Sequence, residues 1–342
     1  MKRNLCSIAV ALALSCGLSA AALATDATIN QTGIDNDAAI TQSVDPIFNA
    51  SATINQSGNL NTATITQGDG FGGLVGPAET ASISSTGNGN HATISQQGNF
   101  AGSATISTTG NNNNASITQD TNANTASITQ SGDSHSATIS QVPFTTGTST
   151  LFTFATATVN QSGQGAAATI NQVGSFESTA SINQTTSWGL NQATVNQGGG
   201  GLGKSASVTQ NNTLGDNATV NQTGASQSAT ILQDDSYNAT ADIGQSGSNQ
   251  TASITQKFIA DDSVAQITQS GSGHTGSITQ TGLSNDALIL QSGTNHTATI
   301  TQSGDAPGNN RNFASITQSG TGHTAAINQA GGGGNHGTIV QN

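Results

Sequence analysis

A short alternating pattern, Ala-x-Ile-x-Gln, recurs along this chain and constrains its fold more than any other feature. In residues 52–67, two copies flank a turn at residues 57–60. Side chains of a β-strand point alternately to opposite faces, so Ala, Ile and Gln share one face while Thr and Asn share the other. An apolar period of two, filled by Thr, Ile and Asn, predicts strand-turn-strand units and disfavours helix.

The half-unit occurs 26 times between Ile29 and Ile339, and 13 of the 25 intervals between its Ile or Val residues are eleven residues long. The residue two before the Ile is Ala except at Gly276 and Gly337, and the residue two after it is Gln in all but two copies. The strict face is therefore the predicted core, where each buried Ile contributes roughly 1.5–3 kcal/mol.

A buried Gln needs hydrogen-bond partners for both its carbonyl and its amide group. A stack of identical Gln side chains, with one strand about 4.8 Å above the next, supplies those partners. We therefore predict an all-β fold: a two-sheet, cross-β solenoid of about 13 stacked strand-turn-strand repeats, roughly 60 Å long.

The residue two before each Ala distinguishes alternate half-units. In even-numbered half-units it is mostly Asn, whereas in odd-numbered ones toward the C-terminus it is Lys204, Gln227, Gln250 and then three His. The two sheets are thus expected to be chemically distinct, with odd half-units stacking on odd and even on even. The three histidines of this position are His274, His296 and His323.

These histidines allow two interpretations. Neutral imidazoles on successive strands could ligate copper or zinc, which makes them weak metal-site candidates. Alternatively, His replaces Asn or Gln as a polar turn residue, and this interpretation is favoured. A related hypothesis is pH sensitivity, because protonating adjacent imidazoles would place like charges close together.

Residues 1–24 read as a secretory signal peptide: Lys2 and Arg3 precede a short apolar run and a small-residue cleavage site. Both cysteines, Cys6 and Cys16, lie inside it. From Thr25 onward the chain has three basic residues against seventeen acidic ones, a net charge of −14 without His. Such a charge disfavours nucleic acid and anionic membranes as partners. The sequence has no second apolar run, so we expect no membrane-spanning segment.

Residues 25–342 are expected to form one domain with loop insertions near residues 43–49, 68–79, 142–154 and 303–311. All four prolines lie in these insertions, where they remove no strand hydrogen bond. No catalytic or cofactor-binding motif is present: Asp133, Ser134 and His135 are adjacent turn residues of a single repeat. We therefore predict no enzymatic activity and no cofactor.

The outward face carries Thr pairs at Thr64/Thr66 and Thr299/Thr301, but Asp242/Gly244 and Leu288/Leu290 interrupt the array. A flat Thr array on a β-solenoid suits ice binding, and an ordinary solvated strand face is the alternative.

The longer pattern Gln-x-Gly-x-x-Asn-x-Ala-x-x-x-Gln is complete at residues 31–42, 56–67 and 280–291, and recurs elsewhere with His or Gln in place of Asn. It resembles the curlin repeat of the curli amyloid subunits of Gram-negative bacteria. The resemblance implies a secreted, extracellular subunit that polymerises into cell-surface fibres of the biofilm matrix. The residues expected to form the amyloid ladders are Gln31, Asn36, Gln42, Gln56, Asn61, Gln67, Gln130, Gln141, Gln280, Asn285, Gln291, Gln302, Gln318 and Gln329.

The resemblance also implies partners: further copies of the chain, a nucleator subunit and an outer-membrane export channel. Two departures leave the export route and the choice between major subunit and nucleator open. The chain has many more repeats than the usual five or so, and it lacks the N-terminal glycine-rich segment that addresses curlins to their exporter. With no cap visible at either end of the repeats, we expect head-to-tail self-assembly and surface adhesion. The alternative function is a soluble secreted solenoid that binds ice or a surface polysaccharide.

Overall fold

The computed structural model of the chain describes residues 8–12, 26–43, 50–68, 79–97, 101–120, 123–143, 154–186, 189–259, 262–304 and 311–342. All regular elements in these ranges are β-strands, as the alternating pattern predicts. The strands are β1 Ile8–Leu12, β2 Asp26–Ile34, β3 Asp37–Ser43, β4 Ala50–Asn59, β5 Thr62–Gly68, β6 Glu79–Asn88, β7 His91–Gln97, β8 Ser103–Asn111, β9 Asn114–Gln119, β10 Thr125–Asp133, β11 Ser136–Val142, β12 Thr156–Gln164, β13 Ala167–Val173, β14 Thr179–Thr186, β15 Gln192–Gly198, β16 Ser205–Asn211, β17 Asn217–Ala225, β18 Ser228–Ser236, β19 Thr240–Ser248, β20 Thr251–Ile259, β21 Val264–Ser272, β22 Thr275–Thr281, β23 Asn285–Thr294, β24 Thr297–Ser303, β25 Asn312–Thr321, β26 Thr324–Ala330 and β27 His336–Gln341.

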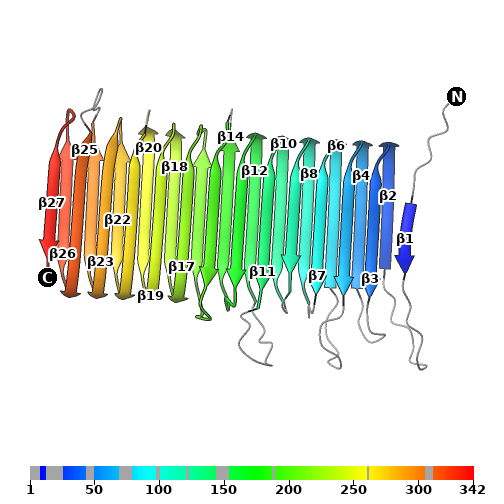
Figure 1. Cartoon of the computed structure of the whole chain (residues 1–342), viewed down its shortest axis with the longest axis horizontal. Helices are drawn as coiled ribbons and strands as arrows, with labels where there is room; N and C mark the ends of the chain where they lie inside the picture. Colours follow the sequence, from blue (N-terminus) through cyan, green and yellow to red (C-terminus); the bar gives the residue numbers. More distant parts are fainter. Residues whose placement is uncertain are drawn as a thin grey trace.

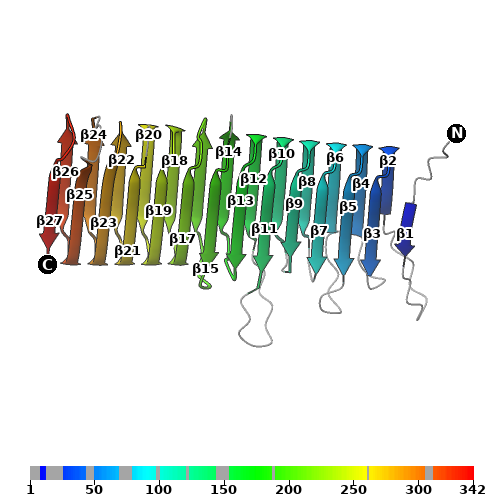
Figure 2. The same ribbon diagram turned by 45° about the horizontal axis from the view of Figure 1, so that its top comes forward.

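The strands form two parallel sheets, one of 13 strands from β2 to β26 and one of 14 strands from β1 to β27. Successive strands alternate between the sheets, so the chain winds forward as a solenoid with two strands per turn (Figure 1). The two sheets lie back to back along the whole stack (Figure 2). The prediction of a two-sheet β-solenoid is confirmed, and so is the stacking of alternate half-units on one another. We call each consecutive pair, from β2/β3 to β26/β27, a rung.

The register is in phase throughout. Ile54 of β4 pairs with Ile29 on one side and with Ile83 on the other, and Gly58 likewise pairs with Gly33 and Gly87. A shift of one residue would turn the whole apolar set to solvent, so the strict Ala, Ile and Gln positions fix this register.

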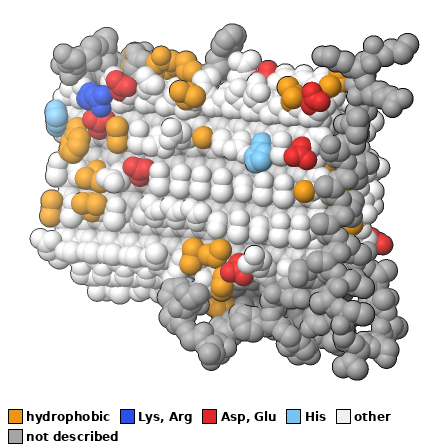
Figure 3. Space-filling model, turned by 45° about the vertical axis from the view of Figure 1, so that its right-hand side comes forward, with side chains coloured by type: hydrophobic (Ala, Val, Ile, Leu, Met, Phe, Trp, Pro, Cys, Tyr) orange, Lys and Arg blue, Asp and Glu red, His pale blue; other side chains and the backbone are white. Residues whose placement is uncertain are grey.

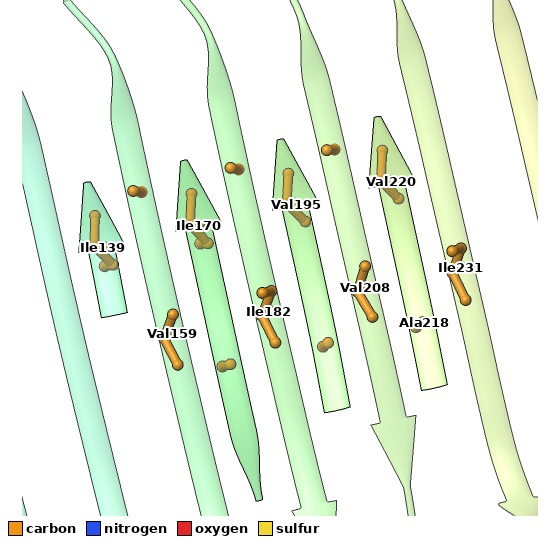
Figure 4. Packing of buried hydrophobic residues seen from close by; sticks show 14 of the residues in the cluster. Ile139, Val159, Ile170, Ile182, Val195, Val208, Ala218, Val220 and Ile231 are labelled. Carbon is orange, nitrogen blue, oxygen red and sulfur yellow. The ribbon is translucent and has the colours of Figure 1, made fainter. Parts of the chain in front are cut away.

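The core is the thin layer between the sheets, filled by the Ala and Ile or Val of each half-unit. Most of these side chains are fully buried, and Figure 4 shows Ile and Val of neighbouring strands packed in rows that run along the stack. At the two ends of the stack, Ala27, Ile29 and Ile339 are only partly buried. Among the described residues, the interior therefore continues to the end rungs without a polar covering.

The structure also places β1, which lies within the predicted signal peptide, parallel to β3, with Val10 opposite Ile40. Removal of residues 1–24 would leave β2–β27 intact, and the signal peptide itself stays a prediction. The predicted insertions fall largely outside the described residues, at 44–49, 69–78, 144–153 and 305–310.

Candidate functional site: amide ladders and turn columns

A continuous Gln ladder runs through the 14-strand sheet. Each Gln donates a hydrogen bond from Nε2 to Oε1 of the Gln on the next strand, at 2.7–3.0 Å. All these bonds point the same way, so the ladder has a direction. At its N-terminal end the buried Oε1 of Gln42 has no partner. The predicted residues Gln42, Gln67, Gln141, Gln291 and Gln318 belong to this ladder, which ends at Gln341.

The ladder of the 13-strand sheet has the same direction but is interrupted. Gln31 donates to Gln56, and a second run continues from Gln130 through Gln280 and Gln302 to Gln329. Between the two runs, Ser85 and Thr108 occupy the Gln positions and bond only to each other, at 3.0 Å.

Both Gln residues that flank this interruption are buried, and each has an unsatisfied atom: Nε2 of Gln56 and Oε1 of Gln130. Their neighbours are too short to reach them. The gap therefore leaves two buried polar groups without partners, an arrangement that costs about 1–3 kcal/mol per group.

The Gln amides also connect the two sheets. Nε2 of Gln96 donates to the carbonyl of Thr80 on the facing sheet, and Nε2 of Gln141 donates to the carbonyls of Thr125 and Ala155. Inside the continuous runs, such an amide group is satisfied both along the stack and across the core, which explains why Gln is nearly invariant among the half-units at this position.

The turns lie on two edges of the solenoid. Edge A holds the turns from the 13-strand sheet to the 14-strand sheet (β2 to β3 and onward), and edge B holds the return turns. The residue two before each Ala, which we call the turn slot, lies at the end of a turn on one of these edges. Asn36, Asn61 and Asn285 are turn-slot residues of edge A, and all three are buried.

The Asn side chains close the edge A turns. Oδ1 of Asn36 accepts the backbone N–H of Asn61 at 3.0 Å, and Nδ2 of Asn61 donates to the carbonyl of Gly87 on the next rung at 2.8 Å. The same pair of bonds recurs at Asn90 and Asn113. The predicted Asn residues therefore form ladders through the turns rather than through the strands.

Each tight turn requires a glycine two residues after the Gln position of the strand that precedes the turn. Gly110 has φ of +115°, and a Cβ placed there would lie 2.0 Å from the carbonyl oxygen of Gly132 in the next rung. Stacked glycines of this kind run along edge A from Gly33 to Gly163, and along edge B from Gly224 to Gly320. The tight glycine turn therefore changes edge midway along the stack, a switch that the sequence analysis missed. The Gln-x-Gly pattern belongs to odd-numbered half-units at Gln31, Gln56 and Gln130. It belongs to even-numbered half-units at Gln222, Gln245 and Gln269, and this change was the signal in the sequence that indicated the switch.

The three predicted histidines stack along edge B. Their ring centroids are 5.1 Å apart and the rings are nearly parallel. Nε2 of His274 bonds the carbonyl of Ser270 at 2.9 Å, while Nδ1 accepts the backbone N–H of His296; His296 repeats this arrangement with Ser292 and His323.

This bonding requires a neutral imidazole with its proton on Nε2. Gln250 makes the equivalent bond to the carbonyl of Ser246, so His here does what an amide does in the same slot. The geometry supports the turn-residue interpretation, because a metal would need a ring nitrogen that already has a backbone partner. The described part of the chain also contains no group of three or more His, Cys, Asp or Glu placed to hold a metal ion.

Buried ionisable side chains also occupy other turn slots, among them Asp216, Lys204 and His135, and their burial was not predicted. Asp216 on edge A accepts the N–H of Ala239 and the hydroxyl of Ser236, and burial raises its pKa to about 6. Lys204 on edge B donates from Nζ to the carbonyl of Gly201 at 2.7 Å, and burial lowers its pKa. His135 on edge A accepts the N–H of Ala166, and burial lowers its pKa.

The fold and these ladders define a class: a β-solenoid repeat protein whose rungs are joined in register by amide side chains. The family model of the curlin associated repeat matches residues 121–150, 237–271 and 271–304. These three segments are thus curlin-type repeats, and together with the β-solenoid fold they support a curli-like structural protein. A comparison with curated proteins finds no match. The described residues contain no helix that is long and apolar enough to cross a membrane.

Proposed function

We propose that this protein is a secreted subunit that self-assembles head to tail into extracellular, curli-like amyloid fibres serving biofilm matrix, adhesion and surface attachment. The observation that carries the proposal is the state of the stack ends. Among the described residues, no strand pairs with the outer edges of β2, β26 and β27. Unpaired strand edges over an uncapped apolar core are a template for adding another chain.

The ladders favour addition of an identical chain in particular. A further copy could continue the Gln ladders in register, and each added Gln would meet the partner that it meets inside the stack. From the curlin resemblance we also propose a nucleator subunit and an outer-membrane export channel as partners, and cell-surface fibres as the location.

The test is fibre formation by the chain that starts at Thr25. We expect fibres in electron micrographs, amyloid dye binding and a reflection near 4.8 Å in fibre diffraction. A matched control replaces Ile29 and Ile339 by Lys, which places charges at the open core ends and should stop growth while leaving the inner rungs folded. A chain that remains monomeric for days at high concentration would contradict the proposal.

A second candidate function is supported by the outer face of the 13-strand sheet. The residues before its Ile or Val form an unbroken hydroxyl column over twelve strands, from Thr28 to Thr299. The interruptions at Asp242/Gly244 and Leu288/Leu290 all belong to the 14-strand sheet. In the view of Figure 3, too, most surface side chains are neither charged nor hydrophobic.

A flat, uncharged hydroxyl face suits binding to ice or to a surface polysaccharide. Thermal hysteresis or polysaccharide binding that is lost when Thr158 and Ser207 are replaced by Lys would support this function. Unchanged binding in that variant, or none in the original chain, would contradict it.

A further inference from the structure

We propose that the junction between two copies forms between rung β26/β27 of one chain and rung β2/β3 of the next, and that the edge A turns of these two rungs must match. This inference rests on the proposed function, since it names the contact by which the fibre grows.

The direction of the ladders determines which ends can meet. The C-terminal rung presents the donor ends of both ladders, Nε2 of Gln329 and of Gln341. The N-terminal rung presents an acceptor, the unpartnered and buried Oε1 of Gln42. Donor and acceptor are paired only when the C-terminal rung of one chain meets the N-terminal rung of another.

The edge A turn of the last rung has the chemistry that the first rung requires. Glycines of the tight-turn type disappear from this edge after Gly163 and return at the C-terminal end, where a Cβ on Gly304 would lie 1.8 Å from the carbonyl oxygen of Gly331. A Cβ on Gly331 itself would meet nothing within 4 Å. Gly331 is therefore the open end of a glycine column that Gly33 of another copy would continue.

The turn-slot Asn residues return at the same place. Oδ1 of Asn312 accepts the N–H of Asn335 at 3.1 Å, just as Oδ1 of Asn36 accepts that of Asn61 in the first rungs. Continuing this pattern, Oδ1 of Asn335 would accept the N–H of Asn36 from the next copy. The middle rungs lack the combination of Asn and glycine: Asn191 accepts the N–H of Asp216 there, but the edge A turn that follows carries Leu214.

Edge B places no such demand on the junction. The two strands of each end rung are joined on edge A, β2 to β3 and β26 to β27. The last residue, Asn342, already accepts a hydrogen bond from the Ser319 hydroxyl at 2.9 Å and lies over Gly320. The edge A turns of the two end rungs therefore face each other across the junction. Both carry a glycine two residues after the Gln and an Asn in the turn slot, although the C-terminal turn is one residue longer.

Cysteine cross-linking tests this register directly, because the chain from Thr25 has no cysteine. Val340 pairs with Thr317 inside the stack, so its partner across the junction would be Thr41 of the next copy. Both Thr41 and Val340 are exposed on the outer face. A chain with Thr41→Cys and Val340→Cys should form disulfides within oxidised fibres, since paired strands place Cα atoms within disulfide reach. The two positions of one chain lie at opposite ends of the stack and cannot bond each other.

The matched control combines Thr41→Cys with Thr317→Cys, which is one rung too far for a disulfide. We expect covalent polymers from the first variant in denaturant, and none from the control. Fibres without cross-links in the first variant would overturn the junction but leave fibre formation standing, whereas no fibres in any variant would contradict the proposed function. Disulfide dimers from Val340→Cys alone would show a tail-to-tail contact and overturn the proposal.

A second variant pair tests the turn. Gly331→Ala on edge A should slow elongation by at least about tenfold, because the added methyl group would meet the incoming turn. Gly322→Ala on edge B has a similarly positive φ and equally open surroundings, and should leave elongation unchanged. Equal effects of the two substitutions would argue against a role for edge A.

Discussion

The N-terminal and C-terminal halves of the stack contain the same kind of rung, but their tight glycine turns lie on opposite edges. From β2 to β13 the tight glycine turn lies on edge A and the longer connections on edge B, whereas from β17 to β26 the tight turn lies on edge B. The difference shows that a tight turn depends on its neighbours. Each glycine makes room for the carbonyl of the glycine above it, so tight turns occur in runs, as expected for a solenoid whose rungs contact only adjacent rungs.

Between the two runs lies a crossover, from β14 to β17, where the edge A column has ended and the edge B column begins with Gly201 stacked on Gly224. Lys204 and Asp216 are both buried there, in turn slots that in most other rungs hold Asn, Gln, His or a small residue. Burying an ionisable group without an opposite charge is costly. The crossover is therefore the place where the stack is expected to be least stable, while the two halves should respond alike to equivalent changes.

The largest expected effect tests that equivalence. Gly110→Ala on edge A and Gly271→Ala on edge B would each place a Cβ 2.0 Å from a carbonyl oxygen of the next rung, at φ near +115°. Each should lower the free energy of unfolding by on the order of 3–5 kcal/mol, measured by denaturant unfolding of the monomeric chain. Gly244→Ala, where a Cβ meets nothing within 4 Å, is the control. Tolerance at one edge but not at the other would show that the halves are not equivalent.

The next effect concerns the crossover. Burial raises the pKa of Asp216 from 3.8 to about 6, so its contribution to stability is present below pH 3.8 and is lost as pH rises through 6. At pH 8, Asp216→Asn should therefore raise the free energy of unfolding by about 3 kcal/mol, at 1.36 kcal/mol per pKa unit. The two chains should differ little below pH 3.8. Unfolding curves at several pH values check this, with the exposed Asp35→Asn as control. An unchanged pH profile would show that Asp216 does not weaken the crossover.

Much of this architecture is predictable from the sequence. The period of two and the strict Ala, Ile and Gln positions determine the strands, their register and the core, because any shift would expose the apolar set. The parity of the turn-slot residues likewise indicates which strands stack. The bonding of individual side chains is not predictable in this way. That His274 uses both ring nitrogens as an amide would, and that Nε2 of Gln56 lacks a partner, depends on side-chain directions and distances between rungs.

The interruption of one Gln ladder gives a smaller effect, confined to the N-terminal half. Ser85→Gln with Thr108→Gln would restore the residue found in the other eleven strands of that sheet and give partners to Gln56 and Gln130. The free energy of unfolding should rise by about 2 kcal/mol, since two buried groups gain bonds while two long side chains lose conformational freedom. Ser84→Gln, on the outer face of the same strand, should change little. A loss of stability would mean that the gap accommodates the missing bonds in another way.

The smallest expected effect concerns the stacked histidines on edge B of the C-terminal half. Burial lowers the pKa of His274, and the neighbouring His296 adds to this shift. A His whose pKa is lowered in the folded state contributes stability above its unfolded value of 6.5, and this is lost as pH falls below it, opposite in sign to Asp216. Replacing His274, His296 and His323 by Gln, which fills the slot at Gln250, should therefore reduce the loss of stability between pH 6.5 and 4. Unfolding midpoints across this range check it, with the exposed His91→Gln as control. An equal acid-side loss in the triple variant would assign the pH dependence to other groups.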